Sequence, residues 1–466
     1  MLELPISSEL RQILTAIQAA GGRALFVGGF VRDFMLGEPS KDIDLEVYGL
    51  TVAQLIAALE PFGWVEQVGV SFGVIKLSTA KTVYDFALPR RENKQGQGYR
   101  GFIIEADPGM SPKEAASRRD YTINAMAISP EGELLDFFGG QADLKNKCLR
   151  HVSERFAEDP LRVLRGFQLA ARFDFTMDSE TVQLCASLKQ EYVHLSKERI
   201  WTEWQKWASK STKPSTGLEV LAQTGWLELY PELAALRGVL QDKVWHPEGD
   251  VWEHSKYVVD EAQILSQREN LNEATRVTLM FAALCHDLGK ATTTIKKAGR
   301  WVSPGHAEAG LALTESFLER IHAPHYLIQA VKPLVAEHMS HINSLSPRAV
   351  RRLALRLEPS IIQMLAFVIE ADASGRPPLP KGLPVGAKRM LELANDLALS
   401  QESPKPILLG RHLLELARDG QLPPEFLHGG RHFSELLSKV FQTQLDGDVN
   451  SLDAAKKMAV EIVESG

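Results

Sequence analysis

The chain has 466 residues, of which 44% are hydrophobic and 24% are charged, a globular composition with room for roughly two to four domains. Its formal net charge of −7 means that a polyanionic partner would have to be held by local basic patches and not by the overall field. Three cysteines without CxxC spacing argue against a disulfide framework and a thiolate zinc site, and they fit a reducing cytoplasm.

No segment predicts secretion or insertion into a membrane. The N-terminal sequence MLELPISSELRQ lacks a basic stretch followed by an apolar core, so it is not a signal peptide. The longest apolar runs, such as LMFAALC, are far too short to cross a bilayer. We therefore expect a cytoplasmic protein with no membrane partner.

Residues 1–150 mix helical and extended patterns, which predicts an α+β head domain. Helical spacing after Ser8 predicts a first helix that Gly21 ends, and ALFV predicts a strand. VRDFML then predicts a helix closed by Gly37, DIDLEV a strand, and TVAQLIAALEPFG a helix with Thr51 as its N-cap. VIKLST and VYDFAL add strands, so we expect a small mixed sheet with helices.

From about Glu158 onward, apolar residues follow helical spacing almost throughout. We expect a helical neck over residues 151–240, a second helical domain over residues 241–375 and a C-terminal helical region over residues 376–466. The Pro- and Gly-rich segment RPPLPKGLPVG, which begins at Arg376, predicts a linker.

Asp42 and Asp44 are separated by one residue in the expected strand DIDLEV. Alternate side chains of a strand share a face, so the two carboxylates would lie about 6.5–7 Å apart and repel each other. Two Mg²⁺ ions about 3.5–4 Å apart would remove this repulsion, one activating an attacking oxygen and one holding a triphosphate. Asp85, in VYDFAL, is a candidate third carboxylate from a neighbouring strand. A surface strand with solvated acids is the alternative.

Gly28 and Gly29 stand directly before the expected helix VRDFML. Because glycine has no side chain, backbone N–H groups at this turn can approach phosphate oxygens, helped by the helix N-terminus. Arg32 is a further candidate nucleotide contact, although an ion pair between Arg32 and Asp33 that fixes the turn explains the same residues.

The segment GGFVRD…KDIDLEV resembles the signature of the polymerase-β-like nucleotidyltransferases, in the branch of tRNA nucleotidyltransferases and poly(A) polymerases. Further segments match this family in order, namely RRDYTINAMA, DFFGGQADL, EDPLRVLRGFQLAARF and KERIWTEW. The resemblance implies a polymerase-β-like head that builds CCA onto the 3′ end of tRNA without a nucleic-acid template. The implied partners are CTP, ATP and the tRNA acceptor end, with Mg²⁺ as cofactor and without DNA, and the oligomeric state stays open.

The segment RRDYTINAMA supplies candidate nucleotide contacts. Arg118 and Arg119 are adjacent cations suited to triphosphate oxygens, and Asn124 can hydrogen-bond a ribose hydroxyl. Asp120 lies between them and belongs to the same candidate nucleotide-binding set. A basic surface turn is the alternative for this segment.

Asp159 and Arg162 are three residues apart in EDPLRVLRGFQLAARF, so we expect them on neighbouring turns of one helix, followed by Arg165. An isolated helix salt bridge explains this spacing too. The resemblance implies that Asp159 and Arg162 act as a protein template that pairs with the incoming base. Cytosine and adenine offer an amine to the carboxylate and a ring nitrogen to the guanidinium. Uracil and guanine place a carbonyl oxygen opposite the carboxylate, and the repulsion between the two rejects these bases. We interpret Arg199, in KERIWTEW, as a structural support of this helix.

The helical body contains a second set of polar side chains that suits divalent cations. Its members are imidazoles and carboxylates on successive helices, and this donor set suits Mn, Fe, Co, Ni or Mg. They are His254, His286, Asp287, His306, His338 and Asp372. The segment from about Trp245 to Gly375 resembles an HD phosphohydrolase domain. The resemblance implies a divalent transition metal such as Ni²⁺, Mn²⁺ or Co²⁺, with the Asp287 carboxylate bridging metal ions. It also implies phosphatase or 2′,3′-cyclic phosphodiesterase activity.

Two basic segments are candidates for RNA binding. SPRAVRRLALRLEP places Arg348, Arg351 and Arg352 on an expected helix, as a phosphate stripe or as a solvated basic face. LPRRENKQGQGYRGF, with Arg90 and Arg91, predicts a loop. In the family that the chain resembles, a flexible loop here governs addition of the final adenosine.

Other activities stay open at this point. The loop after Arg90 departs from the form seen in many family members that complete CCA alone, so CC-only or A-only addition is an alternative. A poly(A) polymerase shares the head motifs, but the sequence from Gln444 onward is not the long basic tail such enzymes carry. An HD phosphohydrolase with an inactive RNA-binding head is an alternative of another class, against which the intact Asp42, Asp44, Asp159 and Arg162 argue.

Overall fold

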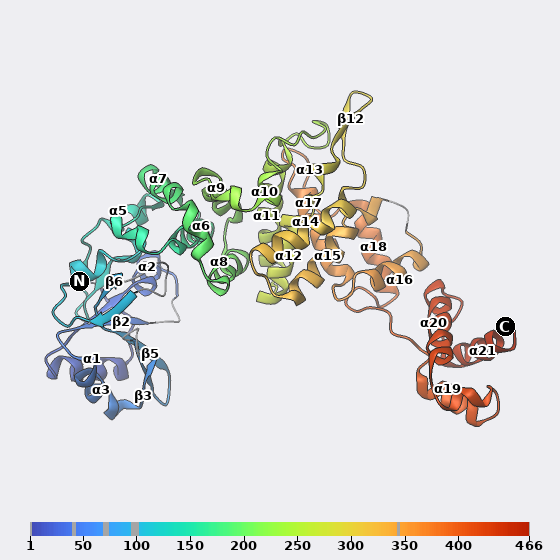
Figure 1. Ribbon diagram of the computed structural model, residues 1–466, viewed down its shortest axis with the longest axis horizontal. Coiled ribbons are helices and arrows are strands. Elements are labelled where there is room, and N and C mark those ends of the chain that lie inside the picture. The colour runs from blue at the N-terminus through green and yellow to red at the C-terminus, as the bar shows by residue number, and fades with distance from the viewer. Residues whose placement is uncertain (1, 40–42, 69–73, 95–101, 343–344, 466) are drawn as a thin grey trace. The chain divides into compact units, whose positions relative to one another are not determined.

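The computed structural model describes residues 2–39, 43–68, 74–94, 102–342 and 345–465, with residues 68, 91–94 and 102–106 described by their backbone alone. The chain divides into two compact units, Met1–Leu229 and Tyr230–Gly466, which are considered separately below (Figure 1). The first unit combines a mixed sheet with helices, and the second is mainly helical, as expected from the sequence.

A seven-stranded sheet forms the centre of the head, in the order β3-β4-β5-β2-β1-β8-β9. β2 and β5 pair in parallel, and the other neighbouring strands pair antiparallel. Its strands are β1 (Arg23–Val27), β2 (Asp44–Tyr48), β3 (Trp64–Val68), β4 (Val74–Ser78), β5 (Val83–Ala87), β8 (Ala127–Ile128) and β9 (Leu134–Leu135). β6 (Arg90–Lys94) and β7 (Phe102–Ala106) form a separate antiparallel pair, so part of the segment expected to be a loop is strand.

Short helices flank this sheet, and their ends follow the signals in the sequence. Ser7 caps α1 and Thr51 caps α3 by accepting backbone N–H bonds. Gly37 ends α2 at a φ of +74°, a conformation that glycine adopts without strain. The helices are α1 (Ser8–Ala19), α2 (Gly29–Leu36), α3 (Val52–Leu59), α4 (Pro112–Ala116) and α5 (Gly140–Lys145).

The neck packs helices around an aromatic cluster that holds α6 in place. Phe167 of α6 lies 4.7 Å from Trp204 between ring centroids, and Trp207 lies 5.5 Å from Trp204. Gly166 gives Tyr121 room to donate a hydrogen bond of 2.8 Å to the carbonyl oxygen of Arg162, because a Cβ at Gly166 would lie 2.1 Å from the Tyr121 hydroxyl. The neck helices are α6 (Leu161–Phe173), α7 (Ser179–Ser187), α8 (Lys197–Lys210) and α9 (Pro214–Gln223), with the two-residue strands β10 (Cys148–Leu149) and β11 (Thr176–Met177) beside them.

The second unit begins with a helical body in which α11, α12, α14, α15 and α17 pack on one another. An antiparallel hairpin, β12 (Ile295–Lys297) and β13 (Arg300–Val302), projects from this body (Figure 1). Its turn residues Ala298 and Gly299 both have positive φ, as a type I′ turn requires. The helices are α10 (Pro231–Ala234), α11 (Val251–Arg268), α12 (Glu273–Cys285), α13 (Lys290–Thr293), α14 (His306–Arg320), α15 (His325–Glu337), α16 (Pro347–Arg356), α17 (Ile362–Ser374) and α18 (Val385–Asp396).

The C-terminal end of the second unit has an apolar core of its own. Leu413, Leu416, Leu436 and Val440 are buried in it, packed by α19 (Gly410–Arg418), α20 (Arg431–Asp446) and α21 (Leu452–Glu464). α20 also packs against α16, which ties this module to the helical body.

Candidate active sites

The first site lies where β2 begins beside β5. Asp44 is the first residue of β2 and is the register partner of Asp85 in the parallel pair. Leu45 and Phe86, the next residues along, are buried on the other face of the sheet, so the two carboxylates share the face that is not packed into the core. Asp42 lies outside the described residues. The structure therefore brings together two of the three expected metal-binding carboxylates.

Gly28 lies close to an acidic and a basic side chain of this site, where a larger residue would be crowded. A Cβ at Gly28 would lie 3.1 Å from Nη1 of Arg119 and 3.5 Å from Oδ2 of Asp44. The backbone φ of Gly28 is +70°, which also favours glycine. Glu46 shares the face of Asp44 and accepts a 3.4 Å bond from Nη2 of Arg119. Paired carboxylates beside a guanidinium and a bare helix N-terminus suit an anionic phosphate group together with a divalent cation.

Four of the expected nucleotide-binding residues, Arg32, Asp120, Asn124 and Arg165, form one continuous hydrogen-bond network. Arg32 is buried, and it donates to Asp33 Oδ1 at 2.9 Å and to Asn124 Oδ1 at 2.7 Å. Asn124 donates in turn to Asp120 Oδ1 at 3.0 Å, and Arg165 Nε donates to Asp120 Oδ2 at 2.7 Å. The network gives these side chains a structural role, and their contact with a nucleotide stays a prediction.

The charge of Asp120 is stabilised by this network. Burial by itself would raise its pKa, but the Arg165 guanidinium and the hydrogen bonds from Asn124 and the backbone of Tyr121 lower the pKa of Asp120 to about 2. Asp120 is therefore ionised at neutral pH, and it fixes Arg165 of α6 to the segment that carries Arg119.

Asp159 and Arg162 meet at the start of α6, in a geometry that differs from the one expected. α6 begins at Leu161, and Asp159 has an extended backbone, with φ −133° and ψ 96°, because the residue before a proline avoids the helical region. The expectation that both residues lie on neighbouring helix turns is therefore wrong. The Arg162 N–H still donates to the Asp159 carbonyl oxygen at 3.0 Å, which keeps the two side chains at one helix end.

Both side chains are held by other parts of the head and neck. Asp159 Oδ2 accepts from Nη2 of Arg199 at 2.6 Å. Arg162 donates to the carbonyl oxygens of Arg155 at 2.7 Å and Arg118 at 2.6 Å. Arg199 therefore belongs to this site, beyond the support role that the sequence suggested. Its only signal in the sequence is its place in KERIWTEW.

Two cavities adjoin at these residues. One, of about 420 Å³, is lined by Arg119, Asp120, Asp159, Leu161, Arg162, Arg165, Arg199, Thr202 and Glu203. The other, of about 300 Å³, is lined by Glu46, Val74, Ala87, Leu88, Arg90, Met110, Ala115, Arg118, Arg119 and Arg162. Arg119 and Arg162 line both, so a ligand with two parts, such as a base and a triphosphate, fits the pair better than a compact one.

The second site is a buried cluster of imidazoles and carboxylates in the helical body. The cluster contains two triads, and the donor atoms within each triad lie within 4.8 Å of one another. One triad is His254, His286 and Asp372, and the other is Asp287, His306 and His338. All six expected metal ligands are therefore close together. They come from five helices or helix ends, with His286 at the C-cap of α12 and His338 at the C-cap of α15.

Backbone carbonyls orient the imidazoles of this cluster. Nδ1 of His286 lies 2.7 Å from the Ala283 oxygen, Nδ1 of His306 lies 2.8 Å from the Ser303 oxygen, and Nδ1 of His338 lies 2.7 Å from the Val335 oxygen. When each Nδ1 carries the proton, Nε2 presents a lone pair to the centre of the cluster. Nε2 of His306 and of His338 are 3.1 Å apart, a repulsive approach unless a cation or a proton lies between them.

The chemistry of the cluster fits divalent cations. The Nε2 atoms of His254 and His286 are buried and face carboxylate oxygens, at 3.2 Å from Oδ1 of Asp372 and 3.2 Å from Oδ2 of Asp287 respectively. Burial and the neighbouring His286 lower the pKa of His338 to about 3, so its imidazole is neutral. Burial alone would lower the pKa of His254, but Asp372 and Glu248 raise it to about 9, and a bound cation would take the place of that proton.

Three residues outside the expected set support this cluster. The side chain of Glu248 is fully buried, and its Oε1 lies 2.8 Å from Nδ1 of His254 and 2.9 Å from Nδ1 of His246. Lys290 Nζ lies 2.7 Å from Oδ2 of Asp287. The spacing of Asp287 and Lys290, three residues in a helical segment, is a signal that sequence reasoning missed.

The α16 arginines expected to bind RNA contact the C-terminal module. Arg348 and Arg352 both bond Oδ1 of Asp446, at 2.8 and 2.6 Å. A Cβ at Gly447 would lie 2.8 Å from Nη1 of Arg351. These cations therefore neutralise the C-terminal end of α20. Their contact with RNA stays a prediction, as does that of Arg90, whereas the side chain of Arg91 lies outside the described atoms.

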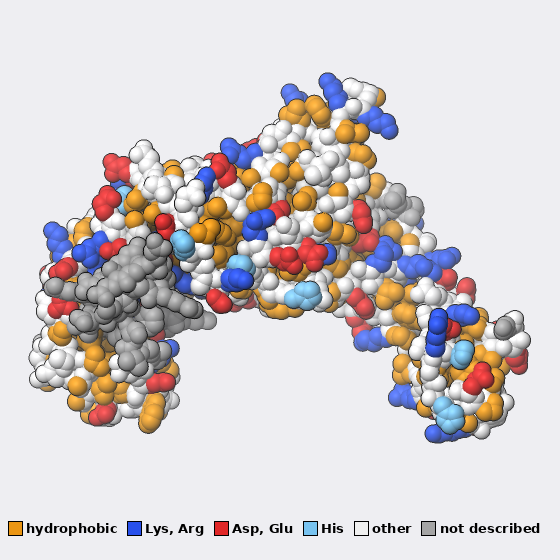
Figure 2. All heavy atoms as spheres, in the orientation of Figure 1, with side chains coloured by type: hydrophobic (Ala, Val, Ile, Leu, Met, Phe, Trp, Pro, Cys, Tyr) orange, Lys and Arg blue, Asp and Glu red, His pale blue; other side chains and the backbone are white. Residues whose placement is uncertain are grey.

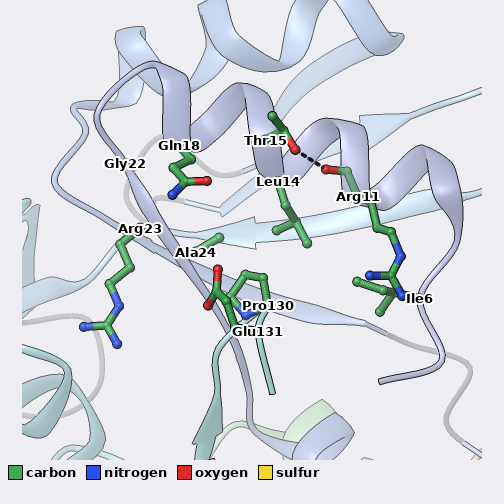
Figure 3. A pocket seen from close by; sticks show the side chains of 10 residues that line it. All are labelled: Ile6, Arg11, Leu14, Thr15, Gln18, Gly22, Arg23, Ala24, Pro130 and Glu131. Atoms are coloured by element: carbon green, nitrogen blue, oxygen red, sulfur yellow. Dashed lines mark hydrogen bonds between the residues drawn. The ribbon is translucent and has the colours of Figure 1, made fainter. Parts of the chain in front are cut away.

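A further cavity, of about 600 Å³, lies beside α1 (Figure 3). Its lining includes Arg11, Arg23 and Glu131, and Figure 3 shows Arg11 and Arg23 reaching away from one another at its two ends. Arg23 is at the other end of β1 from Gly28, and none of the expected site residues lines this cavity. It is separate from both sites.

Among the described helices, none combines the length and apolar character needed to span a bilayer.

Three family models match parts of the chain. They are the poly A polymerase head domain at residues 24–150, the probable RNA and SrmB-binding site of polymerase A at residues 174–236, and the HD domain at residues 251–371. Nucleotidyltransferase head domains and HD domains use divalent metals, and the cluster of imidazoles and carboxylates in the helical body agrees with this chemistry.

Curated relatives cover most of the chain. The multifunctional CCA protein of Pasteurella multocida is 40% identical over 366 residues, which are 75% of this chain and 83% of the relative. That of Mannheimia succiniciproducens is 39% identical over the same shares.

Solved structures share the fold along the whole chain. The Bacillus stearothermophilus CCA-adding enzyme in complex with CTP matches with a TM-score of 0.64, 18% identity and 99% of both chains covered. The Thermotoga maritima CCA-adding enzyme complexed with tRNA matches with a TM-score of 0.57, 18% identity and coverage of 98% of this chain and 96% of that one.

Proposed function

Because this chain belongs to the family of multifunctional CCA proteins, we propose that it is a nucleotidyltransferase that adds CMP and AMP from CTP and ATP to the 3′ end of tRNA. One observation carries the proposal. The two adjoining cavities share Arg119 and Arg162. Arg119 links them to the carboxylate edge of the sheet, because a Cβ at Gly28 would lie 3.1 Å from Nη1 of Arg119 and 3.5 Å from Oδ2 of Asp44.

The phosphate end of the nucleotide lies at the sheet edge in this proposal. Asp44 and Asp85, with Asp42, would hold Mg²⁺, which supplies charge stabilisation and activates the attacking oxygen. Arg119 and the backbone at Gly28 and Gly29 bind the triphosphate oxygens, because the missing Cβ of Gly28 leaves room between the guanidinium and the Asp44 carboxylate. Arg118 and Arg90 line the smaller of the two cavities together with Arg119 and add positive charge there.

The base is selected by Asp159 and Arg162. Each carboxylate oxygen has two lone pairs, so Asp159 can accept from the exocyclic amine of cytosine or adenine while it keeps its bond from Arg199. Arg162 uses two of its N–H groups on backbone carbonyls, and its remaining N–H groups can donate to a ring nitrogen. Arg199 positions the carboxylate. No nucleic-acid template is required, because protein groups supply the pairing edge.

The helical body carries a second activity, the hydrolysis of a phosphomonoester or a 2′,3′-cyclic phosphate. The buried cluster favours it, because the donor atoms of four imidazoles and of the Asp287 and Asp372 carboxylates lie close together in two triads. These residues would hold a divalent transition metal such as Ni²⁺, Mn²⁺ or Co²⁺, which activates water for attack on phosphorus. Glu248 and the backbone carbonyls orient the imidazoles, and Lys290 balances the charge of Asp287.

We further propose a cytoplasmic location, which the three free thiols support. The tRNA acceptor end is the RNA partner, and phosphate contacts by Arg90 and Arg91 belong to this proposal.

The proposal is tested with three tRNA transcripts, ending at the discriminator base, at C or at CC, each incubated with one labelled nucleoside triphosphate at a time. We expect CMP on the first two transcripts and AMP on the third. AMP on the third transcript without CMP on the first two indicates an A-adding enzyme, CMP without AMP indicates a CC-adding enzyme, and long A tracts on unrelated RNA indicate a poly(A) polymerase. The template role predicts that Asp159→Ala relaxes the preference for C and A over U and G, and unchanged selectivity would contradict it.

A further inference from the structure

The β12–β13 hairpin is the most basic short segment beside the buried metal cluster. Residues 288–307 contain Lys290, Lys296, Lys297 and Arg300 and no acidic residue, in a chain whose formal net charge is −7. Lys296, Lys297 and Arg300 are exposed near the hairpin tip, and Figure 2 shows basic side chains gathered there. A local patch of this kind is what a polyanion needs to approach an acidic protein.

The base of the hairpin is bonded to residues of the metal cluster. Thr294 Oγ1 and Ser303 Oγ are 2.8 Å apart and close the base. The Ser303 carbonyl oxygen lies 2.8 Å from Nδ1 of His306, and Thr294 Oγ1 donates to the carbonyl oxygen of Lys290 at 2.7 Å. Lys297 is three residues beyond Thr294, about 10 Å further along the strand. The hairpin therefore rises from the cluster itself.

The hairpin also holds like charges close together. Lys297 and Arg300 are register partners, and like charges directly opposite each other destabilise an antiparallel pair. Arg300 bonds Asp242 Oδ2 at 2.7 Å, whereas Lys296 and Lys297 make no ion pair within the described part of the chain. Lys296 lies over the Trp301 ring, 5.9 Å from its centroid. Uncompensated cations beside an aromatic ring are the combination that binds single-stranded nucleic acid.

We propose that this hairpin makes the buried cluster a site for the end of an RNA chain, with Lys296, Lys297 and Trp301 holding the nucleotides that precede the terminal phosphate. The inference rests on the proposed hydrolysis of a 2′,3′-cyclic phosphate, and it adds that the substrate is a polynucleotide and not a free nucleotide. RNA is the polyanion that fits, since a 2′,3′-cyclic phosphate requires the ribose 2′ oxygen.

The reaction at the RNA end balances without a further reactant. The oxygen of one water molecule bonds to phosphorus while one of the two bonds from phosphorus to a ribose oxygen breaks. One proton of the water ends on the freed ribose hydroxyl, and the product is a phosphomonoester. The hairpin takes no part in these bond changes, so its side chains affect the binding of the chain and not the chemical step.

The test compares hydrolysis of a 2′,3′-cyclic mononucleotide with that of a single-stranded RNA hexamer ending in a 2′,3′-cyclic phosphate. We expect the full-length wild-type protein to have the lower KM for the hexamer. The double variant Lys296→Ala/Lys297→Ala raises the KM for the hexamer alone, and the slope of log KM against log salt falls by about 1.4, since each phosphate contact on a single strand contributes about 0.7. Trp301→Leu raises the KM with little change in that slope, because ring stacking releases no counterions.

A matched control removes two adjacent cations elsewhere in the second unit. Lys388→Ala/Arg389→Ala, on the exposed face of α18, is expected to leave both KM values unchanged. An unchanged KM and salt slope for the hexamer in the Lys296/Lys297 variant would overturn the proposal. So would a wild-type protein that hydrolyses the mononucleotide and ignores the hexamer.

Cross-linking separates this proposal from the activity on which it rests. A hexamer with 4-thiouridine near its 3′ end is irradiated with the full-length protein, and labelled peptides are identified by mass spectrometry. Labelling of residues 295–302 that the Lys296/Lys297 variant loses supports the hairpin contact. If neither substrate is hydrolysed and this labelling is present, the proposed hydrolysis fails and the RNA contact stands. If the labelling is absent, the hairpin proposal fails whatever the activity.

Discussion

The head and the helical body both gather carboxylates for divalent cations, but they do so at opposite levels of exposure. Asp44 is exposed at the start of β2, and the side chain of Asp85 is 44% exposed. Asp287 and His286 are 2% and 1% exposed, and their orientation is fixed by bonds to the protein. An exposed pair can receive a cation together with its nucleotide. A buried cluster must have its ligands oriented beforehand, because desolvated charges are costly without a cation.

The largest expected effect separates the two sites by activity. Asp44→Ala lowers CMP and AMP incorporation by about three orders of magnitude, because several kcal/mol of charge stabilisation in the transition state is lost at about 1.4 kcal/mol per tenfold. Hydrolysis of a 2′,3′-cyclic mononucleotide stays within about twofold, since the two sites share no residue. Incorporation of labelled nucleotide measures the first activity, and chromatography of the nucleoside monophosphate product measures the second. Glu60→Ala, which removes another exposed acid of the head, is the control, and normal incorporation by Asp44→Ala would refute the metal role.

The reverse variant is expected to remove the second activity. His286→Ala lowers cyclic phosphate hydrolysis by at least about 100-fold, because one of the converging lone pairs is lost. Incorporation on tRNA stays near the wild-type rate, which also shows that the chain is folded. His325→Ala removes an exposed imidazole of α15 and should change neither activity. Equal loss of both activities in His286→Ala would mean that the sites are not independent.

A smaller effect is expected from the outer carboxylate of the buried cluster. Glu248→Gln keeps the size of the side chain but weakens the fixed orientation of His254, so the affinity for Mn²⁺ or Ni²⁺ falls about 10- to 100-fold. Isothermal titration of the metal-free protein measures the affinity directly. Glu253→Gln, on the exposed side of α11, is the matched control. Unchanged affinity in Glu248→Gln would show that the backbone contact at Gly375 orients His254 by itself.

The smallest expected effect concerns stability at the head site. The pKa of Asp120 is about 2 in the folded chain against a usual 3.8, so its charge stabilises the fold above about pH 4 and loses that effect as the pH falls toward 2. At about 1.4 kcal/mol per pKa unit, the contribution is about 2 kcal/mol. Hydrogen exchange of α6 amides should therefore show wild type and Asp120→Asn converging between pH 5 and pH 2.5. A difference that does not depend on pH would contradict the assignment.

Local signals in the sequence predicted much of the head. Thr51 caps α3 and Gly37 ends α2 as expected, because both depend on a single residue's bonding or conformation. β3 was missed, since Trp64 is 73% exposed at its start and the strand shows no clear alternation. The start of α6 was placed too early, although Pro160 was visible in the sequence and restricts Asp159.

The sequence by itself determined which chemistry was available, because carboxylates, imidazoles and arginines appear at motif spacing and their side chains have fixed bonding capacity. It also determined the local elements that carry them. Only the tertiary structure decided the partners, namely the parallel register that sets Asp44 opposite Asp85, Arg199 on Asp159, Glu248 on His254, and the α16 arginines on Asp446. These pairs join strands and helices far apart in the chain, where no residue's own preference specifies its neighbour, and packing of the whole unit sets the distances.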